Sequence, residues 1–130
     1  MSGMNTTRRK ADLHVHSNVS HDVPDLPFLA PRALFECALV ERGMDYFTLT
    51  DHDTMAGYSQ LIAQLPEADR RLVIPGVEHT LLDPHIGFSI HVNLFQLDPD
   101  TYARLRGEVV TLEDLLWFCE EEGILAQYNH

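Results

Sequence analysis

The chain has 130 residues, with 9 basic and 20 acidic side chains and a formal net charge of −11. This balance disfavours a broad platform for duplex nucleic acid, because such a surface neutralises phosphates with lysine and arginine. Hydrophobic residues make up 45% of the chain and charged residues 22%, as in a globular domain, and no apolar run approaches the length that crosses a bilayer.

Residues 1–10 are polar and basic and lack the apolar core of a secretory signal, so we expect a cytoplasmic protein. The two cysteines, Cys37 and Cys119, have no partner at the spacing of a zinc ribbon and are expected to be buried thiols. No internal repeat or linker interrupts the chain. Residues 1–130 are therefore predicted to form a single domain.

The first half of the chain predicts two strands, each followed by a helix. A strand over residues 11–15 leads into a proline-rich loop, and Pro31 then suits the first turn of a helix that ends at Gly43. A second strand over 46–49 precedes a helix over 55–65. This alternation is typical of an α/β fold.

The second half continues the alternation. Further strands are expected over residues 72–74, 88–95 and 124–128. The first of these is short and wholly apolar, as is typical of a parallel strand covered on both faces. One helix is expected to begin at Asp98, and another at Thr111, where Asp114 completes a variant of the capping box; Gly123 ends this second helix.

Histidines and carboxylates recur where the expected strands end. His14 and His16 point to the same side of an extended strand, so both imidazoles can reach one ion while Leu13 and Val15 pack behind them. A half-exposed strand gives the same pattern, so this motif alone is a weak signal. The later motifs that carry such residues are Asp51-His52-Asp53, Glu78, His91 and Asn129-His130. A multi-metal site at the rim of a β/α barrel requires this distribution.

These motifs resemble those of the polymerase and histidinol phosphatase (PHP) family. The matching stretches are Asp12-Leu13-His14-Val15-His16-Ser17, Thr50-Asp51-His52-Asp53-Thr54 with Gly57, Pro75-Gly76-Val77-Glu78, His91-Val92-Asn93 and Asn129-His130. They occur in the order of the family and extend from residue 12 to the end of the chain. The resemblance implies a distorted β/α barrel that hydrolyses phosphate esters with up to three metal ions.

The resemblance also implies a set of metal ligands, which comprises His14, His16, Asp22, His52, Glu78, His91 and His130. His14 and His16 would bind one ion, which Glu78 would bridge to a second. His91 and His130 would complete that second ion, and His52 would bind a third. The remaining ligand of the third ion is Asp22, favoured by its spacing from His16, or His21 as the alternative.

Three carboxylates flank these ligands. Asp12, Asp51 and Asp53 are each placed to accept the free ring N–H of a bound histidine, which fixes its tautomer. Asp53 is equally consistent with an N-terminal cap of the helix over 55–65. His79 is expected to face away from Glu78, because neighbouring residues of a strand alternate, and His85 is left as a loop residue that could meet substrate.

Mixed histidine and carboxylate ligation favours two or three ions of zinc, manganese or iron over calcium or magnesium. The predicted reaction is hydrolysis of a small anionic phosphate ester by a metal-bound hydroxide at a di- or trinuclear site. The same site would serve for amide, carbamate or carboxyl ester bonds. A metal-binding chain without activity is a further alternative.

The resemblance implies a barrel of about seven strands, of which this chain is expected to supply only about five. The first and last strands would then be unpaired edges, which invite pairing with another chain. We therefore expect either a domain truncated at its C-terminus or a homo-oligomer that completes the sheet.

Overall fold

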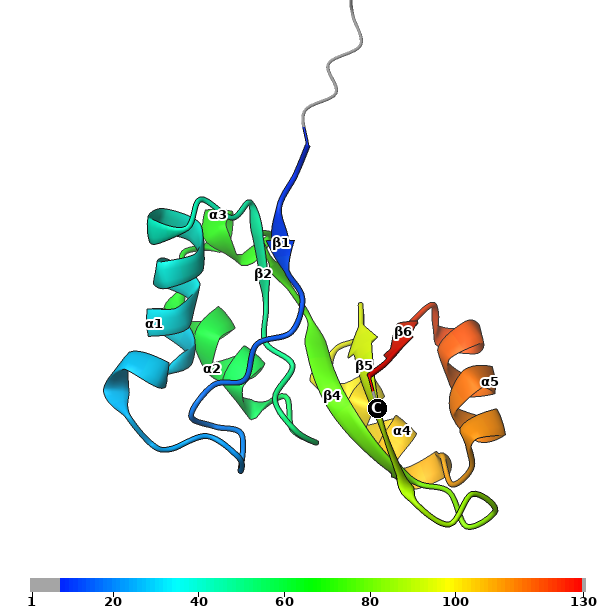
Figure 1. The fold of residues 1–130 in the computed structure, drawn as a ribbon. Helices are drawn as coiled ribbons and strands as arrows, with labels where there is room; N and C mark the ends of the chain where they lie inside the picture. Colours follow the sequence, from blue (N-terminus) through cyan, green and yellow to red (C-terminus); the bar gives the residue numbers. More distant parts are fainter. Residues whose placement is uncertain (1–7, 130) are drawn as a thin grey trace, which may run out of the picture.

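The computed structural model describes residues 8–129, which form two small sheets with helices packed against them (Figure 1). The strands are β1 (Ala11–Asp12), β2 (Tyr46–Thr48), β3 (Val73–Ile74), β4 (Gly76–Leu82), β5 (Ser89–Phe95) and β6 (Leu125–Tyr128). The helices are η1 (Pro27–Leu29), α1 (Pro31–Glu36), η2 (Cys37–Glu41), α2 (Ala56–Gln64), α3 (Glu67–Arg70), α4 (Pro99–Glu108) and α5 (Leu112–Glu122). None of these helices is long and apolar enough to cross a membrane.

The first sheet is parallel and the second is antiparallel. In the first sheet β2 lies between β1 and β3, and in the second β5 lies between β4 and β6. The expected mixed α/β class is confirmed. The structure shows two sheets of three strands among the described residues rather than a closed barrel, so the barrel stays a prediction.

The expected count of five strands was wrong, because a sixth strand, β4, carries Glu78 itself. Pro75 interrupts one extended segment that pairs with β2 through β3 and then with β5 through β4. Since proline has no backbone N–H, it divides the segment. Sequence reading placed Glu78 after a strand, whereas it lies within one.

The first strand is shorter than the expected 11–15, because its ladder of hydrogen bonds ends at Asp12. The chain nevertheless continues alongside the segment after β2. The backbone N–H of Thr50 donates to the carbonyl of Val15 at 2.7 Å, and that of Val15 lies 3.1 Å from Thr50 Oγ1. The Thr50 hydroxyl thus accepts the hydrogen bond that a backbone carbonyl would accept in a continuous strand.

The boundaries of α1 and α5 follow the expected local signals. Pro31 occupies the first turn of α1, and a π-helical turn, η2, extends that helix towards Gly43. The Thr111 hydroxyl accepts from the N–H of Asp114, whose carboxylate accepts in return, which confirms the capping box of α5. Gly123 ends the helix with φ 69°, a left-handed conformation that glycine adopts without strain.

Each sheet has its own apolar core. The first core joins Phe47 and Leu49 to Phe35 of α1 and Leu61 of α2. The second lies between the antiparallel sheet and helices α4 and α5, and includes Leu94, Leu105 and Leu115. In Figure 1 the histidine-bearing segment after β1 runs past the junction between the two sheets. The edges of the described sheets include β1 and β6, as expected.

Candidate metal centre

Four histidines gather at the junction of the two sheets. His14 and His16 come from the segment after β1, His52 from the segment after β2, and His91 from β5. The ring centroids are 5.1 Å apart for His14 and His16, 4.6 Å for His16 and His52, and 5.5 Å for His52 and His91. Residues separated by as many as 77 positions (91 − 14) thus form one cluster.

Glu78 stands at the centre of this cluster. Its Oε1 atom lies 2.8 Å from His14 Nε2 and 3.0 Å from His16 Nε2. Its Oε2 atom lies 3.2 Å from His91 Nδ1 and 3.5 Å from His52 Nδ1. Each carboxylate oxygen therefore faces its own pair of imidazole nitrogens, which is the arrangement of a carboxylate that bridges two ions.

The Glu78 carboxylate is buried, with 1% of its side chain exposed. Burial by itself raises the pKa of such a group, but the neighbouring imidazoles of His14 and His16 outweigh it and lower the pKa of Glu78. For His52, burial is the largest cause and lowers its pKa. A neutral His52 imidazole can offer a lone pair to a cation.

The donor atoms fit a divalent cation. Glu78 Oε2 and His52 Nδ1 are both buried, and neither has a hydrogen-bond partner among the described residues. Such orphaned polar atoms are costly unless an ion or a water satisfies them. Nitrogen and oxygen ligands lie about 2.1 Å from zinc, so two ligands of a tetrahedral ion are about 3.4 Å apart. The separations of 3.2 Å and 3.5 Å between Glu78 Oε2 and its two imidazole nitrogens are close to this value.

Asp22 and His21 both lie beside this centre, on the loop between β1 and η1. Asp22 Oδ2 is 2.9 Å from His16 Nδ1 and 3.5 Å from His52 Nε2. Burial raises the pKa of Asp22, but hydrogen bonds from Ser20 and His16 prevail and lower it to about 2. The ring of His21 lies 5.0 Å from that of His52, centroid to centroid.

Several triads of these side chains bring their donor atoms within 4.8 Å of one another. They are His14, His16 and Glu78; His52, Glu78 and His91; His16, Asp22 and His52; and His21, His52 and Asp53. The structure thus brings together the predicted ligands that it describes. Both choices for the third ion are present, since Asp22 and His21 each form a triad with His52. The predicted ligand His130 lies outside the described residues.

A different carboxylate is placed to accept the ring N–H of a ligand histidine, the role predicted for Asp12, Asp51 and Asp53. Asp22 Oδ2 faces Nδ1 of His16; when that nitrogen donates to Asp22, the lone pair on Nε2 is left for an ion between His16 and Glu78. Asp22 is therefore placed either to bind an ion or to orient His16. Sequence spacing alone cannot separate these roles.

Asp51 holds the backbone rather than a histidine ring. Its Oδ1 accepts from the Ser17 N–H at 2.6 Å and its Oδ2 from the Ser17 hydroxyl at 2.8 Å. Burial is the largest influence on Asp51 and raises its pKa. Gly57 makes room for this pair, since a Cβ there would lie 2.4 Å from Asp51 Oδ2. Asp51 therefore anchors the chain immediately after His16.

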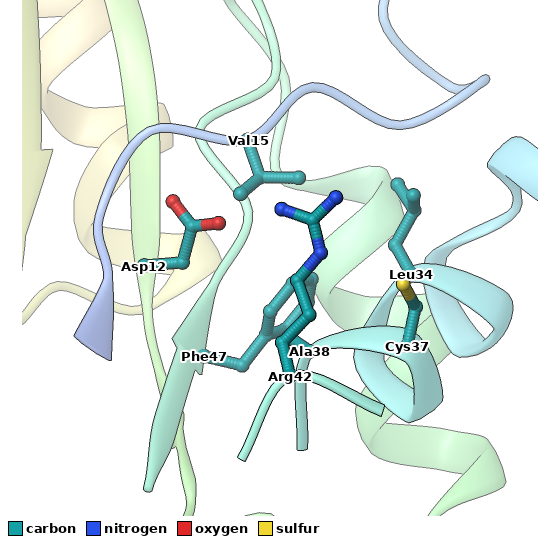
Figure 2. Close-up of a pocket in the computed structure, with 7 residues that line it drawn as sticks. All are labelled: Asp12, Val15, Leu34, Cys37, Ala38, Arg42 and Phe47. Atoms are coloured by element: carbon teal, nitrogen blue, oxygen red, sulfur yellow. The ribbon is translucent and has the colours of Figure 1, made fainter. Parts of the chain in front are cut away.

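Asp12 lies in a pocket on the other side of the β1 segment. Figure 2 shows its carboxylate and the Arg42 guanidinium in this pocket, together with Val15 and Leu34. The β1 ladder ends at Asp12, so the alternation of a strand does not relate its side chain to that of His14. The carboxylate lines this pocket, and its predicted contact with a bound histidine stays a prediction.

Among the described residues, Asp53 neither contacts the ring of a predicted ligand histidine through a hydrogen bond nor caps α2, the two roles predicted for it. Its carboxylate accepts from the Thr80 N–H at 2.6 Å and lies 3.7 Å from His79. The capping interpretation was wrong, because Met55 occupies the N-cap of α2. His79 faces away from Glu78 as predicted, and its Nδ1 lies 2.9 Å from the Tyr102 hydroxyl.

Two serines that received no role from the sequence support the site. Ser17 binds Asp51, as described above, and the Ser20 hydroxyl donates to Asp22 while accepting from the His52 N–H at 3.0 Å. Their position next to the His14-Val15-His16 motif was the only sequence signal for such a supporting role. The sequence does not specify the partner of each hydroxyl, because the partner depends on the path of the loop after His16.

No family model matches the chain, and no curated protein matches it. Among solved structures, a presumed metal-dependent phosphoesterase from Bifidobacterium adolescentis is 27% identical, with a TM-score of 0.53 over 78% of this chain and 35% of that protein. An amidohydrolase from Chromobacterium violaceum, solved with bound sulfate and no metal, is 26% identical, with a TM-score of 0.54 over 76% of this chain and 33% of that protein.

The chain thus spans about a third of the length of each of these proteins. Both descriptions are of hydrolases, one of them metal-dependent. The likeness supports a metal-hydrolase fold for the residues that match.

Proposed function

We propose that this chain is the metal-binding part of a PHP-type metal-dependent hydrolase that cleaves phosphate esters. The observation that carries the proposal is the buried Glu78 carboxylate, whose two oxygens face two pairs of imidazole nitrogens. The likeness to a presumed metal-dependent phosphoesterase supports the same conclusion. The proposed ions are two or three of zinc, manganese or iron.

The proposed ligand sets follow the two sides of Glu78. His14 and His16 would hold one ion with Oε1, and His52 and His91 a second with Oε2, where His130 is also proposed to bind. Asp22 or His21, together with His52, would hold a third. A divalent cation at such a site acts as a Lewis acid and lowers the pKa of a coordinated water, so it supplies the nucleophile without a serine or cysteine.

The protein itself supplies orientation and charge. Asp22 holds His16 so that its Nε2 lone pair faces the ion site, and Asp51 fixes the backbone that follows His16. Glu78 and Asp22 are ionised at neutral pH, since each has a lowered pKa. A chain of net charge −11 repels anions, so the cations at this centre would provide the attraction for a small phosphate ester.

A hydrolase of amide, carbamate or carboxyl ester bonds is the second candidate. The likeness to an amidohydrolase favours it, and the same ligand set would polarise a carbonyl in place of a phosphoryl group. A substrate panel separates the two candidates, because p-nitrophenyl phosphate and a p-nitroanilide release related chromophores from a P–O and a C–N bond. If only the anilide released its chromophore, the proposal of a phosphoesterase would be wrong and that of an amide hydrolase would be supported.

The deciding experiment measures metal content by plasma emission spectrometry on protein purified without chelators. We expect two or three equivalents of zinc, manganese or iron per chain, and a loss of metal in His14→Ala. His85→Ala is the matched control, because His85 is an exposed histidine outside the triads. Unchanged metal content and unchanged phosphatase activity in His14→Ala would overturn the proposal. The mass in solution, measured on the same sample, tests the alternative that a homo-oligomer completes the sheet.

A further inference from the structure

The turn that carries His52 contains a residue in an unfavourable backbone conformation. Asp53 follows His52 and has φ 57°, in the left-handed region that few residues other than glycine adopt. Such a conformation costs about 1 kcal/mol or more and persists only where its surroundings hold it. The position of His52 therefore depends on the contacts of Asp53.

Three groups hold Asp53. Two come from β4, since the Asp53 N–H donates to the Glu78 carbonyl at 2.8 Å and the Thr80 N–H donates to Asp53 Oδ1 at 2.6 Å. The third comes from a helix far along the chain. Arg106 of α4 donates from Nη1 to the carbonyl oxygen of Asp53 at 2.7 Å. A charged donor makes this hydrogen bond stronger than one between neutral groups.

Arg106 is itself positioned by its neighbours. Its guanidinium carbon lies 5.7 Å from the ring centroid of Tyr102, a residue one turn earlier on the same helix. Tyr102 is buried, and its hydroxyl meets His79, which is adjacent to Glu78 in β4. Arg106 therefore contacts the turn that carries His52 while its own helix rests on the strand that carries Glu78.

A second arginine of α4, Arg104, does not contact the Asp53 turn among the described residues and serves as a comparison for Arg106. Arg104 makes an ion pair with Glu122 of α5, and its guanidinium carbon lies 5.4 Å from the Phe118 ring centroid. Both arginines are exposed and lie on the same helix. Arg104 links α4 to α5, whereas Arg106 links α4 to the metal-ligand turn.

We propose that Arg106 is a positioning residue of the metal centre, which fixes the turn at Asp53 so that His52 faces both Glu78 and Asp22. This inference rests on the proposed function, because it assigns Arg106 a role in holding His52 ready for an ion. Arg106 lies outside the four ligand triads. Its contribution is made through the backbone of Asp53.

Cobalt(II) binding to the full chain tests the proposal, followed by equilibrium dialysis and by the visible absorption of the bound ion. We expect Arg106→Ala to weaken cobalt binding about tenfold, at the lower end of the effects of outer-shell residues, and to change the absorption spectrum. Arg106→Lys restores most of the affinity, because an ammonium group can donate to the same carbonyl. Arg104→Ala binds cobalt as the parent does.

The outcomes are distinguishable. A parent chain that binds no cobalt overturns the proposed function, and this inference with it. Cobalt affinity and spectrum unchanged in Arg106→Ala, with normal binding by the parent, overturn the role of Arg106 alone. Equal losses in Arg104→Ala and Arg106→Ala, or no recovery with lysine, indicate a general weakening of α4 and also overturn it. Thermal unfolding with chelator shows whether each variant is folded.

Discussion

The backbones of His52 and Glu78 form a parallel bridge that joins the two sheets. The Glu78 N–H donates to the carbonyl of Asp51 at 3.0 Å, and the Asp53 N–H donates to the carbonyl of Glu78 at 2.8 Å. This isolated bridge repeats the parallel pairing of β2 with β3 four residues further along each segment, from Thr48 and Ile74 to His52 and Glu78. It places the two side chains on a common site, and it couples the geometry of the metal centre to the packing of both sheets.

Replacing the central carboxylate should remove metal-dependent stability. A cation at a hundred times its dissociation constant stabilises the folded chain by about 2.7 kcal/mol, provided that it binds only that state. In Glu78→Gln we expect most of this increment to disappear, because a neutral amide cannot balance two cations. Urea unfolding with and without zinc measures it. Glu120→Gln, an exposed glutamate on α5, is the control, and an undiminished increment in Glu78→Gln would contradict the bridging role.

The metal-free chain should lose stability as the pH falls below neutral, partly through His79. Burial lowers the pKa of His79 from its ordinary value of 6.5, so the unfolded chain takes up this proton first. The stability that a depressed pKa contributes is fully present above 6.5 and is lost as the pH falls through the folded value. Urea midpoints between about pH 8 and about pH 5, with chelator present, measure the loss.

The variant His79→Gln tests whether His79 causes part of the loss of stability at low pH. His79→Gln has no group that titrates in this range, so its stability should fall less steeply than that of the parent. His52 also has a lowered pKa and keeps part of the slope in the variant, whereas the lowered pKa values of Glu78 and Asp22 act mainly below about pH 5. An unaltered slope in His79→Gln would show that His79 is not the source.

Gly57→Ala should destabilise the chain, because the added Cβ would lie 2.4 Å from Asp51 Oδ2 and 3.1 Å from the Ser17 hydroxyl oxygen. We expect a loss of about 1–3 kcal/mol in the free energy of unfolding, as for overpacking elsewhere. Gly107→Ala is the matched control on α4, where a Cβ meets nothing within 4 Å. That change should stabilise the chain by about 0.5–1 kcal/mol. Similar effects at the two glycines would rule out the steric explanation.

The two cysteines should react at different rates. Burial raises the pKa of Cys119 to about 11, so only about one molecule in a thousand carries its thiolate at pH 8. Cys37 lies on η2 and is only partly buried. Iodoacetamide should therefore alkylate Cys37 first, as peptide mass spectrometry of timed samples would show. Faster labelling of Cys119 would mean that the second core opens more readily than its packing implies.

The local features of this protein and the residue types of its site could be read from the amino-acid sequence. Strand and helix positions follow from short-range patterns, such as the capping box at Thr111 and the left-handed stop at Gly123, because these involve only neighbouring residues. The alternation in His14-Val15-His16 likewise placed both imidazoles on one side. The convergence of His14, His16, His52, Glu78 and His91 was predicted from their positions near the ends of expected strands and from the family resemblance, because their spacing alone carries no distance information.

Contacts between groups that are far apart in the sequence depend on the three-dimensional fold. A carboxylate beside a histidine in sequence need not touch its ring, since neighbouring residues of an extended chain point to opposite sides. Asp51 therefore meets Ser17, while Asp22, brought back by its loop, meets His16. Pro75 let one extended segment join a parallel and an antiparallel sheet, which no local pattern specified. The contact of Arg106 with Asp53 depends in the same way on how α4 packs against β4.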